Sequence, residues 1–433
     1  MRKTPSPKRF LRWFGGSIFG GVVLCLGLVI LIDPYDQFRI GVFPGFNLIK
    51  PRLGRYQNEI KLSQAARIDA DALILGHSRA EVGFDPEAPA FARRGLTAYN
   101  LAIPGTSIDT ARRQVEYLLQ TGSKPKVLIL GVEFLDFMEA PRKEPANASP
   151  MLPEIKKKMN LGWFWRFDTV FSLASVKDAI HTLFIQHDQK SETQTSKGFN
   201  PLNEYQALVR REGHFVLFRQ RAHENSKVYL AKANGSLSLA DLAHLRAILA
   251  MARELDSDVN LVIYPYHAQI LALFEETGLF PLFEEWKGQL IHEISVARRL
   301  EPNAHIALFD FSGYGPYNCE KIPVENDRES STRWYWEAGH FKKELGDVVL
   351  NRVLPDPATP HLQLDSENHQ EVFGFHLNES NALRNSQRMH MERLRCATEY
   401  PALFEEAAYL AEEARKTRQL PGTGVFPRFH GHI

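Results

Sequence analysis

The stretch Asp71-Ala-Leu-Ile-Leu-Gly-His-Ser-Arg79 decides the fold prediction for this chain of 433 residues. Its short apolar run ends in glycine and predicts a buried strand followed by a tight turn. A helical pattern at residues 111–119 lies between two further runs of this kind. Short apolar strands separated by helices predict an α/β domain with a parallel sheet that is buried on both faces. The four later strand-like runs are residues 97–103, 126–131, 258–264 and 305–311.

An insertion of roughly a hundred residues separates the third predicted strand from the fourth, which is far longer than an ordinary loop. We place it at residues 140–236. Residues 153–186 are aromatic and are predicted to be helical, whereas residues 187–234 are polar and are predicted to be irregular. We expect the insertion to cap the carboxyl ends of the strands. A disordered loop is the alternative for its polar half.

Two further patterns concern the last part of the predicted α/β domain: the start of a helix before the fourth strand, and a change of composition where the domain ends. Ser238-Leu-Ala-Asp241 resembles a capping box, and it predicts the start of a helix that runs through Leu255 into the fourth strand. The domain is therefore expected to cover residues 71–354. Beyond it the chain is polar and rich in proline. A helical pattern at residues 402–416 predicts a helical extension over residues 355–433.

The N-terminus has the composition of a membrane anchor. Residues 1–12 are basic without an acid, and residues 13–32 contain no charge. Twenty apolar residues at roughly 1.5 Å each cross a hydrocarbon core of about 30 Å. The basic tail predicts a cytoplasmic N-terminus in a bacterial inner membrane, with a juxtamembrane segment (33–70) and the body in the periplasm. A cleaved signal peptide and a buried soluble helix are the alternatives, but the run is too long for the first and lacks an A-x-A site.

The composition excludes several classes of protein. The chain is 44% hydrophobic and 24% charged, as is typical of a globular protein. Its 52 Lys+Arg against 51 Asp+Glu leave a net charge of +1, without the basic surplus of a nucleic-acid binder. No CxxC pair, phosphate-binding GxxxxGK[ST] or Rossmann glycine triplet is present, so neither a metal site nor a cofactor is predicted. In an oxidising compartment Cys319 and Cys396 either form a disulfide or remain two thiols.

One serine and one histidine are candidates for covalent catalysis. Ser78 follows the first strand, where ligands of open α/β sheets bind and where a turn exposes a hydroxyl group. A serine needs a base to accept its proton, and the base needs an acid to orient it. His340 and Glu337, three residues apart at a predicted helix start, supply such a pair, with Asp310 as the alternative acid. The structural alternatives are a helix-capping role for Ser78 and a packed histidine at position 340.

Other polar residues have two open interpretations. His267, after the fourth strand, either faces the same cleft and contacts substrate or packs on Tyr266. Arg79 either binds an anionic group or pairs with a surface acid. The aromatic run 334–336 either stacks on a sugar ring or alternates in burial at a strand edge.

These motifs, in this order, resemble the SGNH (GDSL-like) hydrolases and acyltransferases. The sequences of these motifs are most similar to those of the membrane-anchored periplasmic branch involved in alginate O-acetylation and teichoic-acid D-alanylation. The resemblance covers residues 71–354 without the insertion, and it implies a three-layer, flavodoxin-like α/β fold. The stretches that carry it are 73–79 (LILGHSR), 81–86 (EVGFDP), 100–105 (NLAIPG), 128–137 (LILGVEFLDF) and the acid-x-x-His at 337–340.

The resemblance implies a role for each matching residue. Ser78 matches the nucleophile, His340 the general base, and Glu337 the triad acid, which is an aspartate in the family. The backbone N–H groups of Ser78 and Gly105 match two oxyanion donors. The third family donor is an asparagine, where this chain has Glu133, and an ionised carboxylate cannot donate a hydrogen bond. We therefore expect Glu133 to point away or a residue such as Asn100 to replace it; otherwise the site is weakened or inactive.

The implied function is a serine esterase or O-acyltransferase that acts on acyl, most simply acetyl, groups of a cell-envelope polysaccharide. The resemblance also implies a membrane-bound acyl donor protein as a partner. The alternative is a catalytically inactive scaffold or glycan-binding component of an exopolysaccharide assembly, and Glu133 favours that alternative.

Overall fold

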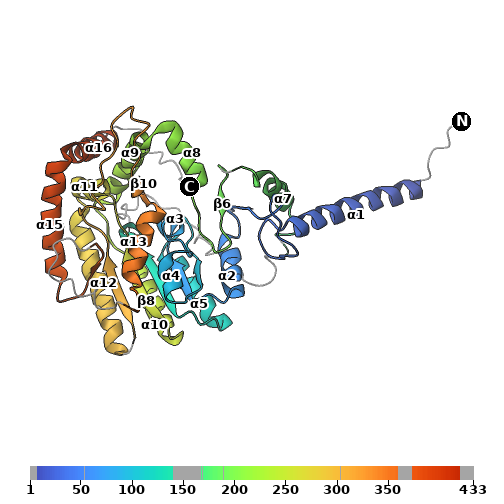
Figure 1. Ribbon diagram of the computed structural model, residues 1–433, viewed down its shortest axis with the longest axis horizontal. Helices are drawn as coiled ribbons and strands as arrows, with labels where there is room; N and C mark the ends of the chain where they lie inside the picture. The colour runs from blue at the N-terminus through green and yellow to red at the C-terminus, as the bar shows by residue number, and fades with distance from the viewer. Residues whose placement is uncertain are drawn as a thin grey trace, which may run out of the picture.

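The computed structural model describes residues 7–52, 54–139, 167, 169–188, 190–302, 304–358 and 373–419. Helix α1 (Pro7–Ile32) projects from a larger body (Figure 1). It is long and apolar enough to cross a membrane, and only 11% of its most apolar window is buried by the protein. The sequence-based prediction of one N-terminal apolar helix is confirmed, and the helix begins before the predicted apolar run because the basic residues preceding it are also helical.

A six-stranded sheet with the order β12-β9-β8-β4-β2-β3 forms the centre of the body. All five predicted strands are present, and they pair in parallel. The sixth strand pairs antiparallel with β9 and comes from the segment that we expected to be only helical. The strands are β2 (Ala72–Leu75), β3 (Ala98–Asn100), β4 (Val127–Val132), β8 (Asp258–Ile263), β9 (Ile306–Asp310) and β12 (Phe375–His376).

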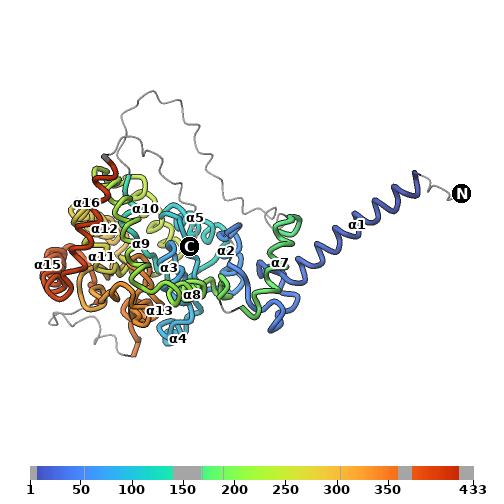
Figure 2. The backbone as a smooth tube through the Cα atoms, turned by 90° about the horizontal axis from the view of Figure 1, so that it is seen from above, coloured from blue at the N-terminus to red at the C-terminus, as the bar shows by residue number. Residues whose placement is uncertain are grey.

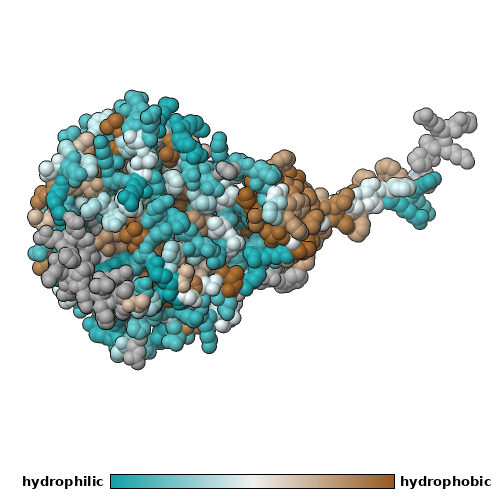
Figure 3. Space-filling model, in the orientation of Figure 1, coloured by the Kyte–Doolittle hydropathy of each residue, from teal (hydrophilic) through white to brown (hydrophobic). Residues whose placement is uncertain are grey.

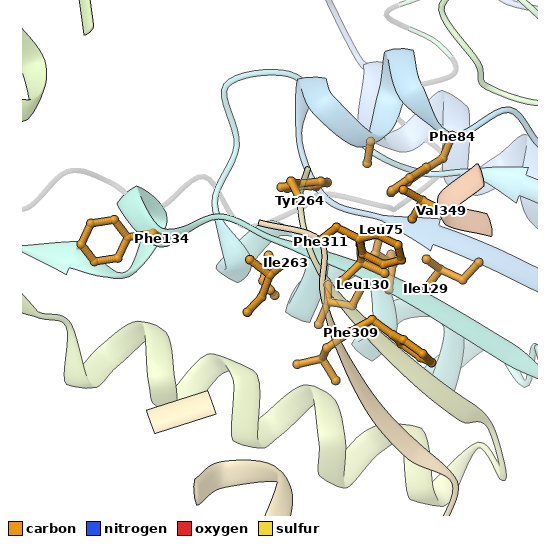
Figure 4. Packing of buried hydrophobic residues seen from close by; sticks show 14 of the residues in the cluster. Leu75, Phe84, Ile129, Leu130, Phe134, Ile263, Tyr264, Phe309, Phe311 and Val349 are labelled. Atoms are coloured by element: carbon orange, nitrogen blue, oxygen red, sulfur yellow. The ribbon is translucent and has the colours of Figure 1, made fainter. Parts of the chain in front are cut away.

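Helices cover both faces of this sheet, which explains why every residue of β2 and β4 is buried. The side chains of Leu75, Ile129, Leu130, Ile263 and Phe309 pack together in the core (Figure 4). The helices around the sheet are α2 (Gln57–Arg67), α3 (Ser78–Gly83), α4 (Pro89–Arg93), α5 (Ile108–Thr121), α10 (Leu239–Glu254), α11 (Ala268–Thr277), α12 (Phe280–Leu300) and α13 (Lys343–Val353). The protein is thus a mixed α/β structure, as predicted.

The predicted helix cap at residue 238 is confirmed. The hydroxyl group of Ser238 accepts a hydrogen bond from the backbone N–H of Asp241 at 3.2 Å, and α10 begins at the next residue.

The polar half of the insertion is largely helical, so the prediction of an irregular segment was wrong. It forms β6 (Thr193–Gln194), α8 (Asn203–Glu212) and α9 (His214–Lys232). The buried side of α9 includes His214, Ala222 and Ser226, so the apolar periodicity that identifies a helix is weak there. In the other half, α7 (Leu173–Ile185) is helical as expected, and residues 140–166 and 168 lie outside the described part of the chain.

The C-terminal extension contains α15 (Ala382–Glu399) and α16 (Pro401–Gln419). Helix α16 packs on α9 and α11, which joins the extension to the insertion. A disulfide connects Cys319 to Cys396 and answers the question that the sequence left open. Three short pairs of strands and one 3-10 helix complete the described part of the body: β1 (Lys50–Pro51) with β6, β5 (Met138–Glu139) with β7 (Ser236–Leu237), β10 (Tyr335–Glu337) with β11 (His340–Phe341), and η1 (Phe134–Phe137).

Candidate active site

A tight turn at the carboxyl end of β2 presents Ser78 to solvent. Gly76 has φ +144°, and a Cβ at this position would overlap the hydroxyl group of Tyr264, so the turn requires glycine. His77 is the N-cap of α3, and its Nδ1 accepts a hydrogen bond from the backbone N–H of Arg79. The alternative interpretation of Ser78 as the helix cap is therefore wrong, and its hydroxyl group is available for chemistry.

His340 lies between Ser78 and Glu337. Its Nε2 is 2.9 Å from the hydroxyl oxygen of Ser78, and its Nδ1 makes a short hydrogen bond to the Glu337 carboxylate. Glu337 ends β10 and His340 begins β11, so the pair sits on a two-residue hairpin turn and not at the predicted helix start. The other Glu337 oxygen accepts a hydrogen bond from the N–H of Gly339 at 2.6 Å.

The electrostatics of this relay fit a histidine base. Burial opposes ionisation of Glu337, but Arg221, His340 and the Gly339 N–H together hold its pKa at about 2. Burial lowers the pKa of His340 below its ordinary value, against the opposing pull of Glu337. At neutral pH the imidazole is therefore uncharged beside an ionised carboxylate. Such a carboxylate keeps the proton on Nδ1, which leaves the Nε2 lone pair for the hydrogen of Ser78.

Helix α9 of the insertion contributes two site residues that the sequence did not reveal. The Nε atom of Arg221 lies 3.3 Å from Glu337, whose side chain is fully buried. Asn225, one turn further along α9, lines the same pocket as Ser78. Their spacing of four residues is a signal for one face of a helix. In a segment predicted to be irregular, this spacing does not point to a shared face.

Arg79 is the counter-charge of Glu133. The guanidinium of Arg79 forms an ion pair with one Glu133 oxygen, and the Tyr266 hydroxyl group donates to the other at 3.0 Å. Arg79 also donates to the Gly339 carbonyl at 2.6 Å and lies over the Tyr266 ring. Of the two interpretations of Arg79, pairing with an acid is confirmed, but the acid is buried inside the site and does not lie at the surface. A paired carboxylate repels a developing oxyanion less than a free one does.

His77 belongs to the same polar group. Its Nε2 is 3.6 Å from Glu133 and 3.9 Å from Asp136. Burial lowers the pKa of His77 to about 4, so the ring is neutral and cannot stand in for Arg79 as the counter-charge. Burial raises the pKa of Asp136, against the opposing effects of His77 and Arg79.

Ser78 and Gly105, whose backbone N–H groups are the predicted oxyanion donors, line the pocket, whereas Asn100 does not. Gly105 has φ +67° and lines the Ser78 pocket. Within the described residues, the N–H groups of Ser78 and Gly105 donate to no protein acceptor. Asn100 is fully buried, and its amide donates to the Ala80 and Phe84 carbonyls at 2.8 Å. The expectation that Asn100 serves as an oxyanion donor is therefore wrong.

Two other candidates, His267 and Asp310, have structural roles instead. His267 is fully buried, caps α11 and bonds the Glu320 carbonyl through Nε2, so it does not contact the cleft as expected. Asp310 is held by Lys287, Ser312 and Asn385, so Glu337 is the acid that orients His340.

The aromatic run is also structural in the main. Tyr335 is fully buried, whereas Trp336 packs edge-on against Tyr205 and Trp334 packs on Tyr317, away from the pocket residues. The burial alternates along β10, which matches the strand-edge interpretation.

A polar pocket of about 590 Å³ surrounds Ser78. It has hydroxyl, amide, carboxylate and guanidinium groups suited to a hydroxyl-rich ligand. Among the described residues, no three His, Cys, Asp or Glu side chains are grouped to hold a metal ion. The lining residues are His77, Ser78, Arg79, Gly105, Thr106, Ser107, Thr110, Glu133, Leu135, Asp136, Arg221, Asn225, Gly339 and His340.

The arrangement contains the parts needed for acyl transfer to and from a serine: a nucleophile, a neutral base, an ionised acid and free backbone donors. No model of a known protein family matches this chain, and a search of curated proteins found no match either.

Proposed function

We propose that this protein is a membrane-anchored serine esterase or O-acyltransferase of the SGNH (GDSL-like) type. The observation that carries the proposal is the continuous relay from Ser78 through His340 to Glu337, in which the Ser78–His340 distance is 2.9 Å. The relay joins three residues that are up to 262 positions apart in the chain. A serine, a neutral histidine and an ionised acid in this order are the working parts of acyl-enzyme chemistry.

The reaction has two halves. The Ser78 oxygen attacks the carbonyl carbon of an ester while its proton moves to His340 Nε2. The tetrahedral oxyanion is expected to accept hydrogen bonds from the N–H groups of Ser78 and Gly105. The ester bond breaks, and His340 returns the proton to the departing alcohol. Water or a sugar hydroxyl group then attacks the acyl-serine and gives its proton to His340. The acyl–serine bond breaks, His340 returns the proton to the Ser78 oxygen, and an acid or a new ester is released.

The pocket and the helix α1 support the proposed substrate class and location. The polar pocket fits hydroxyl-rich acceptors, so a cell-envelope polysaccharide carrying acetyl or similar acyl groups is the proposed substrate. The basic residues Lys8, Arg9 and Arg12 at the start of α1 favour a cytoplasmic N-terminus and a body in the periplasm. A transferase in that compartment needs an activated acyl group, for which a membrane-bound acyl donor protein is the proposed source.

The alternative function is an inactive scaffold or glycan-binding component of an exopolysaccharide assembly. It was favoured by Glu133 at the third oxyanion position. The ion pair between Glu133 and Arg79 weakens that argument, because the carboxylate has its own counter-charge.

A fluorophosphonate probe, which forms a covalent bond with activated serines, tests the proposal. The full-length protein in detergent is expected to be labelled, and Ser78→Ala and His340→Ala are expected to remove the label. Ser107→Ala is the matched control, because Ser107 lines the same pocket but bonds to no basic side chain among the described residues. Unlabelled wild-type protein that still unfolds cooperatively would favour the scaffold. If labelling succeeds, release of free acid or of an acylated oligosaccharide from an aryl ester separates hydrolysis from transfer.

A further inference from the structure

Large apolar side chains are exposed on the body where α1 joins it. They lie in residues 38–48 and 171–184, which we call the basal surface. Nine such side chains are exposed there, as many as in all the rest of the described body outside α1. Apolar surface gathers around the base of α1 in Figure 3. The exposed members are Phe38, Ile40, Val42, Phe43, Leu48, Phe171, Leu173, Ile180 and Phe184.

Helix α7 packs directly on the last turns of α1. Val29 and Ile32 of α1 form one buried cluster with Ala179 of α7, and Val176 and Leu183 lie against this cluster. In Figure 1 and Figure 2, α7 lies beside the end of α1 that meets the body. The Tyr35 hydroxyl group also bonds Ser175 and Asp178 of α7, at 3.0 and 2.8 Å.

The outward side of α7 is an exposed apolar stripe. Leu173, Ile180 and Phe184 are seven and four residues apart, which places them on one side of the helix. Leu173 is 88% exposed and Phe184 is 76% exposed. Lys177 is exposed on the same side, where a lysine can extend its ammonium group to lipid headgroups. An apolar stripe with a basic residue is typical of helices that lie in a membrane interface.

The segment 38–48 is held in place with its apolar side chains exposed. The Asp33 carboxylate accepts hydrogen bonds from the N–H groups of residues 37–39. The fully buried Asn47 donates to the Ile32 carbonyl at the end of α1 and accepts from the N–H of Phe43 at 2.8 Å. The backbone is thus fixed to α1, and Phe43 points outward from an ordered turn.

The position of the basal surface along α1 fixes its depth relative to a bilayer. The charge-free residues 13–32 span about 30 Å, which matches the hydrocarbon core, so Ile32 marks the edge far from the basic tail. Val29 lies about 4.5 Å deeper by helix rise. Because α7 covers both Val29 and Ile32, it lies at the level where hydrocarbon meets headgroups.

From this geometry we infer that the basal surface is embedded in the outer interfacial layer of the same bilayer that α1 crosses, with α7 parallel to the membrane plane. The occupant is lipid, because the exposed apolar side chains continue directly from the lipid-facing surface of α1. The body is then held at the membrane surface by an interfacial helix as well as by the anchor. This inference depends on α1 crossing the membrane and is independent of the proposed chemistry.

Lipid quenching of site-specific fluorophores tests the inference. Full-length protein is reconstituted in vesicles of phosphatidylethanolamine and phosphatidylglycerol with or without brominated acyl chains. Cys25 in α1 is the one free cysteine among the described residues, so its label reports insertion of the anchor. The basal positions are Phe184→Cys and Phe43→Cys in a Cys25→Ser background. Leu300→Cys on α12 is the control, with a similar exposure of 71%.

The expected result is quenching by brominated lipid at positions 25, 43 and 184 and none at 300. Quenching at 25 without quenching at 184 would overturn the inference while leaving the anchor intact. If position 184 is protected in native membranes but unquenched in pure lipid vesicles, the surface binds a protein partner and the lipid inference fails. Absence of quenching at position 25 would overturn the anchor and the inference together. Fluorophosphonate labelling of Ser78 in the same vesicles reports the catalytic proposal separately.

Discussion

The Nε atom of Arg221 lies 3.3 Å from the carboxylate of Glu337, so a helix of the insertion stabilises the acid that orients His340. Glu337 has no exposed side-chain surface, and an ionised carboxylate without a counter-charge is costly in such a place. The insertion is therefore part of the relay and not only a cover over it.

Arg221→Met is expected to lower kcat/KM. Losing this ion pair leaves the buried Glu337 carboxylate without a partner, which costs about 1–3 kcal/mol. That range corresponds to roughly 5–150-fold in rate. Esterase assays on an aryl acetate measure the loss. Lys227→Met, an exposed charge on the same helix, is the matched control and should leave the rate unchanged. Equal losses in the two variants would show that Arg221 acts only through the fold of α9.

The pH dependence of kcat/KM should follow His340. Only the neutral imidazole accepts the Ser78 proton, so activity is lost as pH falls through the pKa of His340. Burial lowers that pKa, so the acid limb should lie below the ordinary histidine value of about 6.5. Arg221 lowers the same pKa, so Arg221→Met should move the limb to higher pH. An acid limb above 6.5 in the wild-type protein would contradict this prediction.

Breaking the Arg79–Glu133 pair should destabilise the protein. Both side chains are at least 90% buried, and removing one partner of a buried ion pair costs about 3–5 kcal/mol. Arg79→Ala should also lower activity, because it leaves the Glu133 charge beside the oxyanion site. Chemical denaturation of Arg79→Ala, Glu133→Ala and the double variant measures the coupling. Additive losses in the double variant would mean that the two side chains do not interact.

Loss of the disulfide should destabilise the C-terminal half. The bond closes a loop with a sequence separation of 77, for which chain entropy predicts about 4 kcal/mol. The double variant Cys319→Ser/Cys396→Ser and the reduced wild-type protein should unfold at lower denaturant concentration. Cys25→Ser, in the apolar helix α1, is the control and should unfold like the wild type.

The sequence predicted the strands and the helix after residue 238 because these elements depend on local patterns. Five buried strands give five apolar runs, and a serine cap has a recognisable spacing. It failed at α9 because a helix that places His214 and Ser226 on its buried side has no clear apolar stripe. It also could not reveal β12, since a two-residue strand has almost no pattern of its own.

The sequence by itself determined the apolar helix α1, the parallel pairing of the five strands and the choice of Ser78, Glu337 and His340 as candidates, because each depends on residue type and local pattern. Only the tertiary structure decided which charges meet. Considered alone, the Glu133 carboxylate would repel an oxyanion, but in the structure it is paired with Arg79. Arg221 reaches Glu337 across 116 positions because α9 packs against β10. Coulomb interactions fall with distance in space and not along the chain, so only the fold could show them.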